Sequence, residues 1–390
     1  MASARTYLDH NATSPIRPEV LDAVTSALAR GGNPSSVHAE GRAARALVER
    51  ARAQVAALVG ARPEDVIFTS GGTEANGMAL RPGALAGSGG PVRRLACPRV
   101  EHASVLAGHG FDETETDLIG VDPGGRIDLD GLARVLDRVA GEPVLVSVQA
   151  ANNETGVAQP LAAVADLVHA HGGALHCDAV QAAGRIPTDM GALGLDALTL
   201  SGHKLGAPAG VGALVLAAGT AGPDLPFIRG GGQESRSRAG TENVAAIVGF
   251  GVAAEIAGTS LLREAARLRE LRDLAEREVC RLAPEAVVFG AGADRIPNTL
   301  AFAVPGLPAE TALMSLDLDG VAVSSGSACS SGKVAPSHVL AAMNVPGELA
   351  RGAIRVSLGW NSREEDVVRF SQAFETLLRR LYVRGRACAA

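Results

Sequence analysis

The sequence predicts an α/β protein with a large domain built on a mostly parallel sheet and a smaller α+β domain. Short β-rich apolar runs alternate with Ala- and Leu-rich amphipathic stretches from about residue 38 to residue 258, which is typical of βα units. After Gly258 the pattern changes to a long charged helix followed by a few separate strands and helices. The 390 residues suffice for two domains. We therefore expect residues 15–258 to form the large domain, and residues 1–14 with 259–390 to form the small one.

The apolar runs predict the individual elements in chain order. Strands of the large domain are expected at Val66–Thr69, Arg94–Cys97, Val144–Val148, Ala174–Cys177, Ala197–Leu200 and Val211–Leu216. Its helices are expected at Arg42–Val59, Leu132–Val139 and Leu161–His171, where apolar residues recur three and four positions apart. In the small domain we expect a helix at Leu261–Leu282, a strand at Asn298–Val304, a helix at Glu310–Leu318, a strand at Ile354–Leu358 and a last helix from Arg363. Open α/β sheets bind ligands at the carboxyl ends of their strands, so we look for chemistry there.

Composition argues against several classes of function. The net charge is −6, no basic cluster stands out and only 11 aromatic residues are present, so nucleic acid is not an expected partner. The best membrane candidate, Val244–Gly258, is too short and contains Glu255, and no secretory signal is visible in the first residues. The five cysteines are widely spaced without a CxxC pair, which disfavours a disulfide framework or a metal site. We expect a cytoplasmic protein with no membrane contact.

The segment Thr199–Lys204 is a strand that ends in Ser, Gly, His and Lys. A lysine at such a strand end can be desolvated, which lowers its pKa and makes the amine a nucleophile for aldehydes. An ordinary solvated lysine after a strand would have the same sequence.

Asp178 ends another apolar strand, about 26 residues upstream of Lys204. A buried carboxylate needs a partner, and the protonated pyridine nitrogen of pyridoxal 5′-phosphate (PLP) held by a lysine would supply one. The alternative is that Asp178 caps the start of a helix.

Phe68–Asn76 is a strand that runs into a glycine turn and opens a helix. The free backbone N–H groups at that helix start and the hydroxyl of Thr73 form a potential phosphate cradle. A plain strand–turn–helix junction would look similar.

Two further polar residues stand near predicted strand ends. His102 is a flat side chain that could lie against an aromatic cofactor and exchange protons near neutral pH, or serve a structural role at a helix start. Asn153 could bond a phenolic oxygen with its amide, or form a turn with the nearby glycine.

Together these segments resemble the cysteine desulfurases, PLP enzymes of the class V aminotransferase branch that supply sulfur for iron–sulfur clusters. The likeness extends over nearly the whole chain and rests on an ordered set of motifs. These are YLDHNATSP at 7–15 with its preceding Thr6, GNPSSVH at 32–38, FTSGGTEAN at 68–76, ANNETG at 151–156, HCDAVQ at 176–181, SGHK at 201–204, GGGQE at 230–234, RAGTEN at 238–243, SSGSACSSG at 324–332 and IRVSLG at 354–359.

The resemblance implies PLP fold type I, with a seven-stranded sheet in the large domain. It also implies that Lys204 carries the cofactor as an internal aldimine, that Asp178 pairs with the pyridine nitrogen and that His102 stacks on the ring. The remaining implied roles belong to residues around the cofactor and the substrate. Asn153 and Gln181 lie near the ring oxygen; Gly72, Thr73, Ser201 and His203 hold the phosphate, joined by Thr241 from the second subunit of a homodimer; Arg355 binds the substrate carboxylate, assisted by Asn33 and Asn153.

Cys329 separates this prediction from an ordinary aminotransferase. It stands in a stretch of Ser and Gly rather than among bulky apolar neighbours, which indicates a reactive thiol rather than a packed one. Catalytic roles are thus expected for Lys204, Cys329 and His102. The implied reaction converts L-cysteine to L-alanine and leaves the sulfur as a persulfide on Cys329, for an iron–sulfur assembly scaffold or another acceptor protein. The alternatives are a selenocysteine lyase or class V aminotransferase on the same scaffold, and a non-catalytic relative.

Two positions depart from the family pattern. Ala209 stands where a lysine usually follows the proline after the Schiff-base lysine, and Ser235–Ser237 replaces the commoner Arg-Gly-Arg before Arg238. Neither change removes an assigned catalytic group, but both put contacts near the cofactor in question.

Overall fold

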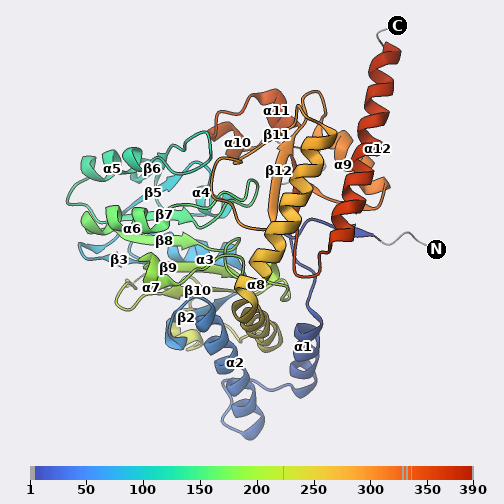
Figure 1. Ribbon diagram of the computed structural model, residues 1–390. Coiled ribbons are helices and arrows are strands. Elements are labelled where there is room, and N and C mark those ends of the chain that lie inside the picture. The colour runs from blue at the N-terminus through green and yellow to red at the C-terminus, as the bar shows by residue number, and fades with distance from the viewer. Residues whose placement is uncertain (1–4, 223, 327–328, 331–332, 335, 389–390) are drawn as a thin grey trace.

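The structure is a computed structural model that describes residues 5–222, 224–326, 329–330, 333–334 and 336–388. For 329–330, 333–334 and 381–388 it describes the backbone alone. A sheet flanked by helices forms the larger part, and α8, α9 and α12 gather with a second sheet at its side (Figure 1).

The central sheet has seven strands in the order β2-β10-β9-β8-β7-β5-β6. Their bounds are β2 Val66–Thr69, β5 Arg94–Pro98, β6 Thr116–Ile119, β7 Val144–Gln149, β8 Ala174–Asp178, β9 Ala197–Ser201 and β10 Gly212–Leu216. Only β10 runs antiparallel to its neighbours among these strands, so the predicted mostly parallel seven-stranded sheet is confirmed. The edge strand β6 was not predicted, because its sequence TDLI is half polar and lacks a continuous apolar run.

Helices cover both faces of this sheet, because alternate residues of the buried strands point to opposite sides. In β7, Val144, Val146 and Val148 enter the core beneath α2, α5, α6 and α8, whereas Leu145 enters the core beneath α3. The helices and 3₁₀ turns of this part are α1 Pro18–Arg30, α2 Ala39–Leu58, η1 Pro63–Asp65, α3 Gly72–Ala79, α4 Ala103–Leu106, η2 Glu113–Glu115, α5 Leu129–Arg138, α6 Leu161–Ala170, α7 Met190–Leu193, η3 Gly202–Lys204 and η4 Glu234–Arg236, with the short hairpin β3 Ala86–Gly87 and β4 Gly90–Pro91.

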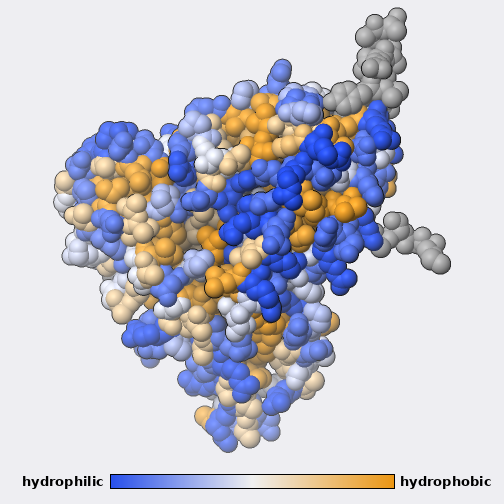
Figure 2. Space-filling view, viewed as in Figure 1, coloured by the Kyte–Doolittle hydropathy of each residue, from blue (hydrophilic) through white to orange (hydrophobic). Residues whose placement is uncertain are grey.

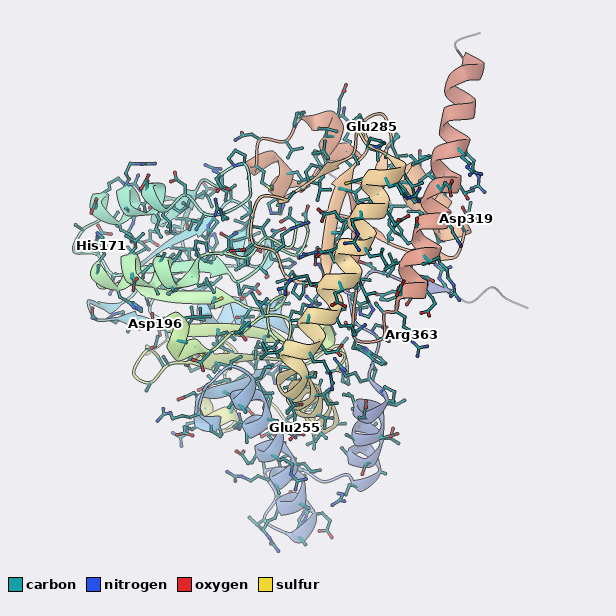
Figure 3. The ribbon with its side chains drawn as sticks, in the orientation of Figure 1. His171, Asp196, Glu255, Glu285, Asp319 and Arg363 are labelled. Carbon is teal, nitrogen blue, oxygen red and sulfur yellow. The ribbon has the colours of Figure 1, made fainter. Side chains whose placement is uncertain are left out.

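A single 39-residue helix, α8 Val244–Leu282, connects the two parts. The expected start at Leu261 is wrong: Asn243 caps the helix by accepting a hydrogen bond from Ala246 N at 3.2 Å, and the helix passes through Gly258 unbroken. Its first half is apolar because it packs on α1 and α2. Glu255 lies on that half and Glu285 follows the other end of the helix (Figure 3). The domain limits at 258 and 259 remain a prediction.

The N-terminal half of α8 is apolar because it lies inside the protein. In the described part of the chain it is the one helix long and apolar enough to cross a membrane, but 56% of its apolar window is buried inside the protein, as in core helices generally. Its C-terminal half is coated with charged residues, visible as a hydrophilic band in Figure 2.

The smaller part is a four-stranded antiparallel sheet in the order β11-β12-β17-β14, packed on helices. Its apolar core is centred on Phe302, Phe370 and Phe374. The N-terminal strand β1 joins this part by pairing in parallel with β13. The bounds are β1 Thr6–Tyr7, β11 Val287–Val288, β12 Thr299–Ala303, α9 Ala309–Leu318, β13 Val321–Ala322, β14 Ser324–Ser325, β15 Cys329–Ser330, β16 Lys333–Val334, α10 His338–Ala342, α11 Gly347–Arg351, β17 Ile354–Ser357 and α12 Glu364–Cys388.

Gly359 packs directly against the imidazole of His10, which is fully buried and bonded to Ser14 Oγ at 2.9 Å. A Cβ atom at position 359 would overlap that ring. We expect Gly359→Ala to lower the free energy of unfolding by about 1–3 kcal/mol, as overpacking does in other cores. The midpoint of thermal unfolding measures the effect. Gly292→Ala is the matched control because a Cβ there meets nothing within 4 Å, and an equal loss in both variants would contradict the prediction.

Candidate active site

A cavity of about 600 Å³ lies where the carboxyl ends of β7, β8 and β9 face the start of α3 and residues of the small sheet. Ten of the predicted site residues line it. They are Gly72, Thr73, His102, Asn153, Asp178, Gln181, Ser201, His203, Lys204 and Arg355. The structure therefore brings together residues that the sequence separates by up to 283 positions, from Gly72 to Arg355.

Lys204 ends the 3₁₀ turn that follows β9 and is half-buried. Its Nζ donates hydrogen bonds to Asn11 O at 2.5 Å and Ala12 O at 2.7 Å. Burial, and then the positive charges of Arg185 and Arg355, lower the pKa of Lys204 to about 7. The amine is thus not an ordinary solvated one, and a large share of it is uncharged and nucleophilic near neutral pH.

Asp178 is the last residue of β8 and is only 7% exposed. One carboxylate oxygen accepts a hydrogen bond from Asn76 Nδ2 at 2.8 Å, and the other accepts from Val180 N at 3.0 Å. The residues after Asp178 form turns, so it does not cap a helix. It is a buried acid in the wall of the same cavity as Lys204, where it can stabilise a cation.

His102 caps the short helix α4, its Nδ1 accepting from Ser104 N at 3.1 Å. This bond places the ring proton of the neutral form on Nε2. Burial is the main cause that lowers the pKa of His102, so the neutral imidazole dominates near pH 7. His102 therefore both caps α4 and lines the cavity, so the two roles expected from the sequence do not exclude each other.

The start of α3 forms one end of the cavity, with Gly72 and Thr73 at its first turn and Ser201 and His203 opposite. Glu74 folds back to accept from Ser70 N at 2.8 Å, and Arg238 compensates its charge at 2.8 Å. Open N–H groups at a helix start favour an anion, so this end is chemically suited to a phosphate.

Arg355 comes from β17 of the small sheet and is 5% exposed. Its guanidinium bonds Asp9 Oδ1 at 2.7 Å and Asn153 O at 3.0 Å. Its Nε is buried without a hydrogen-bond partner in the described structure. A guanidinium held in this way at a cavity wall suits a carboxylate ligand.

Two predicted residues do not line the cavity. Asn33 lies in an exposed loop where its Oδ1 accepts from Ser35 N at 2.9 Å, and Thr241 is exposed. The roles expected for Asn33, and for Thr241 across a subunit interface, stay predictions.

The backbone of Cys329 lies in β15, paired with β16, and its side chain lies outside the described part. The buried carboxylate of Glu154 contacts the chain on both sides of Cys329, at Gly326 before it and at Ser337 after it. It accepts from Ser337 Oγ at 2.6 Å and lies so close to Gly326 that a Cβ there would come within 2.8 Å. The other thiols differ: burial raises the pKa of Cys97 to about 12 and that of Cys177 well above its usual value, and Cys280 is exposed on α8.

Sequence reasoning missed several residues that build this site. They are Asp9, Asn11, Asn76, Glu154 and Arg185. Four of them stand inside motifs that mark the site, so their position was the available signal. Arg185 follows the HCDAVQ motif and carries no such signal.

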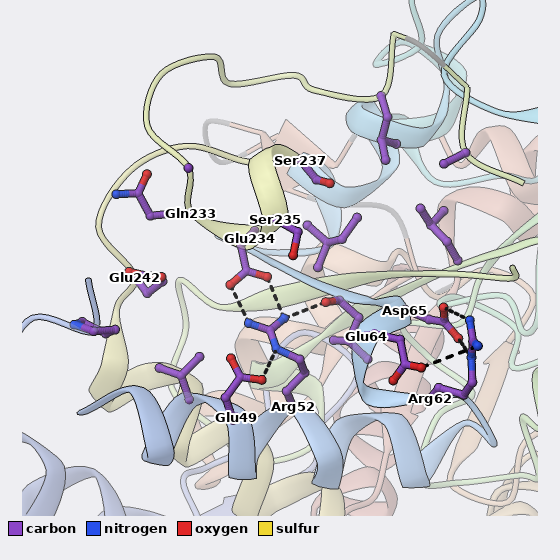
Figure 4. Close-up of a pocket in the computed structure, with 18 of the residues that line it drawn as sticks. Glu49, Arg52, Arg62, Glu64, Asp65, Gln233, Glu234, Ser235, Ser237 and Glu242 are labelled. Atoms are coloured by element: carbon purple, nitrogen blue, oxygen red, sulfur yellow. Dashed lines mark hydrogen bonds and ion pairs between the residues drawn. The ribbon is translucent and has the colours of Figure 1, made fainter. Parts of the chain in front are cut away.

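A larger cavity of about 950 Å³ lies elsewhere and contains none of the predicted residues. Several of its charged side chains are paired with each other, among them Arg52 with Glu234 at 2.7 Å and Arg62 with Asp65 at 2.8 Å (Figure 4). Glu234, Ser235 and Arg236 have positive φ there, so the departure at Ser235–Ser237 falls on a strained turn next to this cavity.

The fold and the site define an α/β enzyme in which a nucleophilic lysine and a buried acid share one cavity with an anion-binding helix start. The model of the Aminotransferase class-V family matches residues 6–370, and the chain belongs to this family. It is 41% identical over 379 residues to "Cysteine desulfurase IscS" of Dictyoglomus turgidum, covering 96% of this chain and 95% of that protein.

Solved structures agree in fold. A NifS-like protein from Rickettsia africae superposes with a TM-score of 0.86 at 34% identity, covering 96% of this chain and 99% of that one. The solved structure of SspA in complex with cysteine superposes with a TM-score of 0.75 at 26% identity, covering 90% of this chain and 98% of that one.

Proposed function

We propose that this protein is a PLP-dependent cysteine desulfurase, which converts L-cysteine to L-alanine and passes the sulfur on as a persulfide of Cys329. The observation that carries the proposal is the single cavity in which Lys204, Asp178 and Arg355 meet the start of α3. The name of the relative from Dictyoglomus turgidum and the cysteine bound by the structurally similar SspA support it.

The residues present fit PLP. The amine of Lys204 would hold the aldehyde carbon, and Asp178 would face the pyridine nitrogen, which needs a buried anion. Gly72, Thr73, Ser201 and His203 offer donors for the phosphate at the other end of the cavity. When bound, the cofactor supplies an electron sink for the carbon from which the substrate loses a proton.

The chain's own side chains carry the remaining chemistry. Arg355 binds the substrate carboxylate through its positive charge and the guanidinium N–H groups that Asp9 and Asn153 O leave free. The uncharged amine of Lys204 accepts the Cα proton, and neutral His102, whose ring proton is on Nε2, can donate that proton at the site. The thiolate of Cys329 attacks the substrate sulfur: a sulfur–sulfur bond forms, the carbon–sulfur bond breaks with its electron pair left on the organic fragment, and protonation of that fragment gives alanine.

Partners follow from the same proposal. A second copy of the chain would supply Thr241 to the phosphate, giving a homodimer. The persulfide would be passed to an iron–sulfur assembly scaffold or another acceptor protein in the cytoplasm.

The test is one incubation of the PLP-loaded protein with L-cysteine and a thiol reductant. We expect alanine and sulfide in equal amounts, and one added sulfur atom on the Cys329 peptide when the reductant is left out. Cys329→Ser should keep cofactor absorption and lose both products. Unchanged alanine production by Cys329→Ser would overturn the role of Cys329, and keto acid in place of alanine would identify an aminotransferase instead.

A further inference from the structure

Arg185 is a buried cation without an acidic partner. Its side chain is 7% exposed, and Nη1 donates to Gln181 O at 2.8 Å and to Gln181 Oε1. None of the carboxylates in the described part of the chain forms an ion pair with it. By contrast Arg52, Arg272, Arg295 and Arg355, which are also well buried, each pair with an acid. Burying a guanidinium without a counter-ion is costly, so this position needs an explanation.

Arg185 fixes which end of the Gln181 amide faces the cavity. A guanidinium has only donors, so the Gln181 oxygen must face Arg185 and the NH₂ group must point away from it. Gln181 Nε2 accordingly donates to Asn11 O at 3.0 Å. Asn11 O also accepts a hydrogen bond from Lys204 Nζ at 2.5 Å. A chain of hydrogen bonds therefore runs from Arg185 through Gln181 and Asn11 to the amine of Lys204.

Arg185 also acts on Lys204 by its charge. Both side chains line a small cavity of about 40 Å³ behind the site, together with Arg17, Glu264 and Trp360. After burial, Arg185 is the largest cause that lowers the pKa of Lys204. Arg355 acts in the same direction, and Asp9 and Asp178 oppose it. Burial first, and then nearby positive charges that include Arg185, also lower the pKa values of His203 and His10. The positive charge of Arg185 therefore acts on Lys204, His203 and His10 alike.

We propose that Arg185 is a positioning residue: a fixed cation without an acidic partner among the described residues that holds the Gln181 amide with its NH₂ group on Asn11 O and places a positive charge beside the Lys204 amine. It acts through Lys204 and Gln181 and is not among the residues that line the cavity of about 600 Å³. The proposal rests on the proposed function for its catalytic meaning, but the state of Lys204 can be measured without turnover.

The experiment uses the protein freed of PLP and follows acetylation of Lys204 by acetic anhydride as a function of pH. Lys204 and Lys333 are the two lysines of the chain, so peptide mass spectrometry separates the amine of interest from an internal reference. We expect a reactivity midpoint near pH 7 in the native sequence. In Arg185→Met the midpoint should rise by about one pH unit, because a nearby like charge has been removed. Arg185→Lys keeps the charge and should keep the midpoint.

Arg272→Met is the matched control, since Arg272 is 8% exposed and donates to Ile296 O at 3.1 Å in a different part of the fold. It should leave the Lys204 midpoint where it is. If Arg185→Met does not fold, Arg185→Gln gives the same comparison with a polar side chain. A midpoint that stays near pH 7 in the folded neutral variant, or that moves equally in Arg272→Met, overturns the proposal. This holds whether or not the protein makes alanine, so failure here is distinguishable from failure of the desulfurase assignment.

Discussion

Lys204→Ala is expected to abolish alanine formation from L-cysteine. The variant loses both the amine that holds the cofactor and the base that accepts the Cα proton, and a positioned base alone is worth about 10²- to 10⁴-fold in rate. The measurement is alanine release with added PLP, together with the visible absorption of lysine-bound cofactor. Lys333→Ala is the control for that absorption, because Lys333 is the other lysine of the chain and should not be needed for it.

The same amine predicts a pH dependence for cofactor capture. Burial and Arg185 depress the pKa of Lys204 to about 7, so the uncharged form is the minority below that pH and the majority above it. The rate at which cofactor-free protein takes up PLP should fall about tenfold per pH unit below 7. A persistent lysine-type absorption band in Lys204→Ala, or uptake that is independent of pH between 5 and 7, would contradict the assignment of Lys204.

Local sequence was enough for the strands that position the site. Each of the six runs predicted as strands is a strand of the central sheet, because residues buried on both faces leave a nearly continuous apolar run. Asp178 was predictable for the related reason that a polar residue at the end of such a run must stand at the sheet edge, and Lys204 because only one short turn separates it from the end of β9. The edge strand β6 was missed because one of its sides is open and its sequence is correspondingly polar.

What sequence could not supply is the set of partners across long separations. The Lys204 amine is held by Asn11 O and Ala12 O, and a backbone carbonyl leaves no trace in side-chain identity. Arginine is usually a surface residue, and only the fold shows that Arg185 is buried and forms no ion pair with a carboxylate of the described residues. The start of α8 was misplaced because the apolar stretch from Val244 resembles a separate buried helix until α1 and α2 are seen to cover it.

Asp178→Asn is expected to reduce turnover by about 30- to 4000-fold, since truncating one partner of a buried charge pair costs about 2–5 kcal/mol. The fold should tolerate the change, because Val180 N can still donate to the amide oxygen of the new side chain. The Asn76 amide, which donates to Asp178 through Nδ2, can rotate so that its Oδ1, unpartnered among the described residues, accepts from the new NH₂ group. Steady-state alanine formation and the midpoint of thermal unfolding are measured on the same preparation.

Asn76→Ala separates the effect of the Asp178 charge from the effect of the hydrogen bond that holds Asp178 in position. It removes the 2.8 Å bond to Asp178 and leaves the carboxylate in place. We expect it to have the smaller effect on rate. If Asp178→Asn retains turnover within about threefold of the native protein, no cation is stabilised at the end of β8. The cofactor would then have to bind in a different orientation from the one that Lys204 and the start of α3 define.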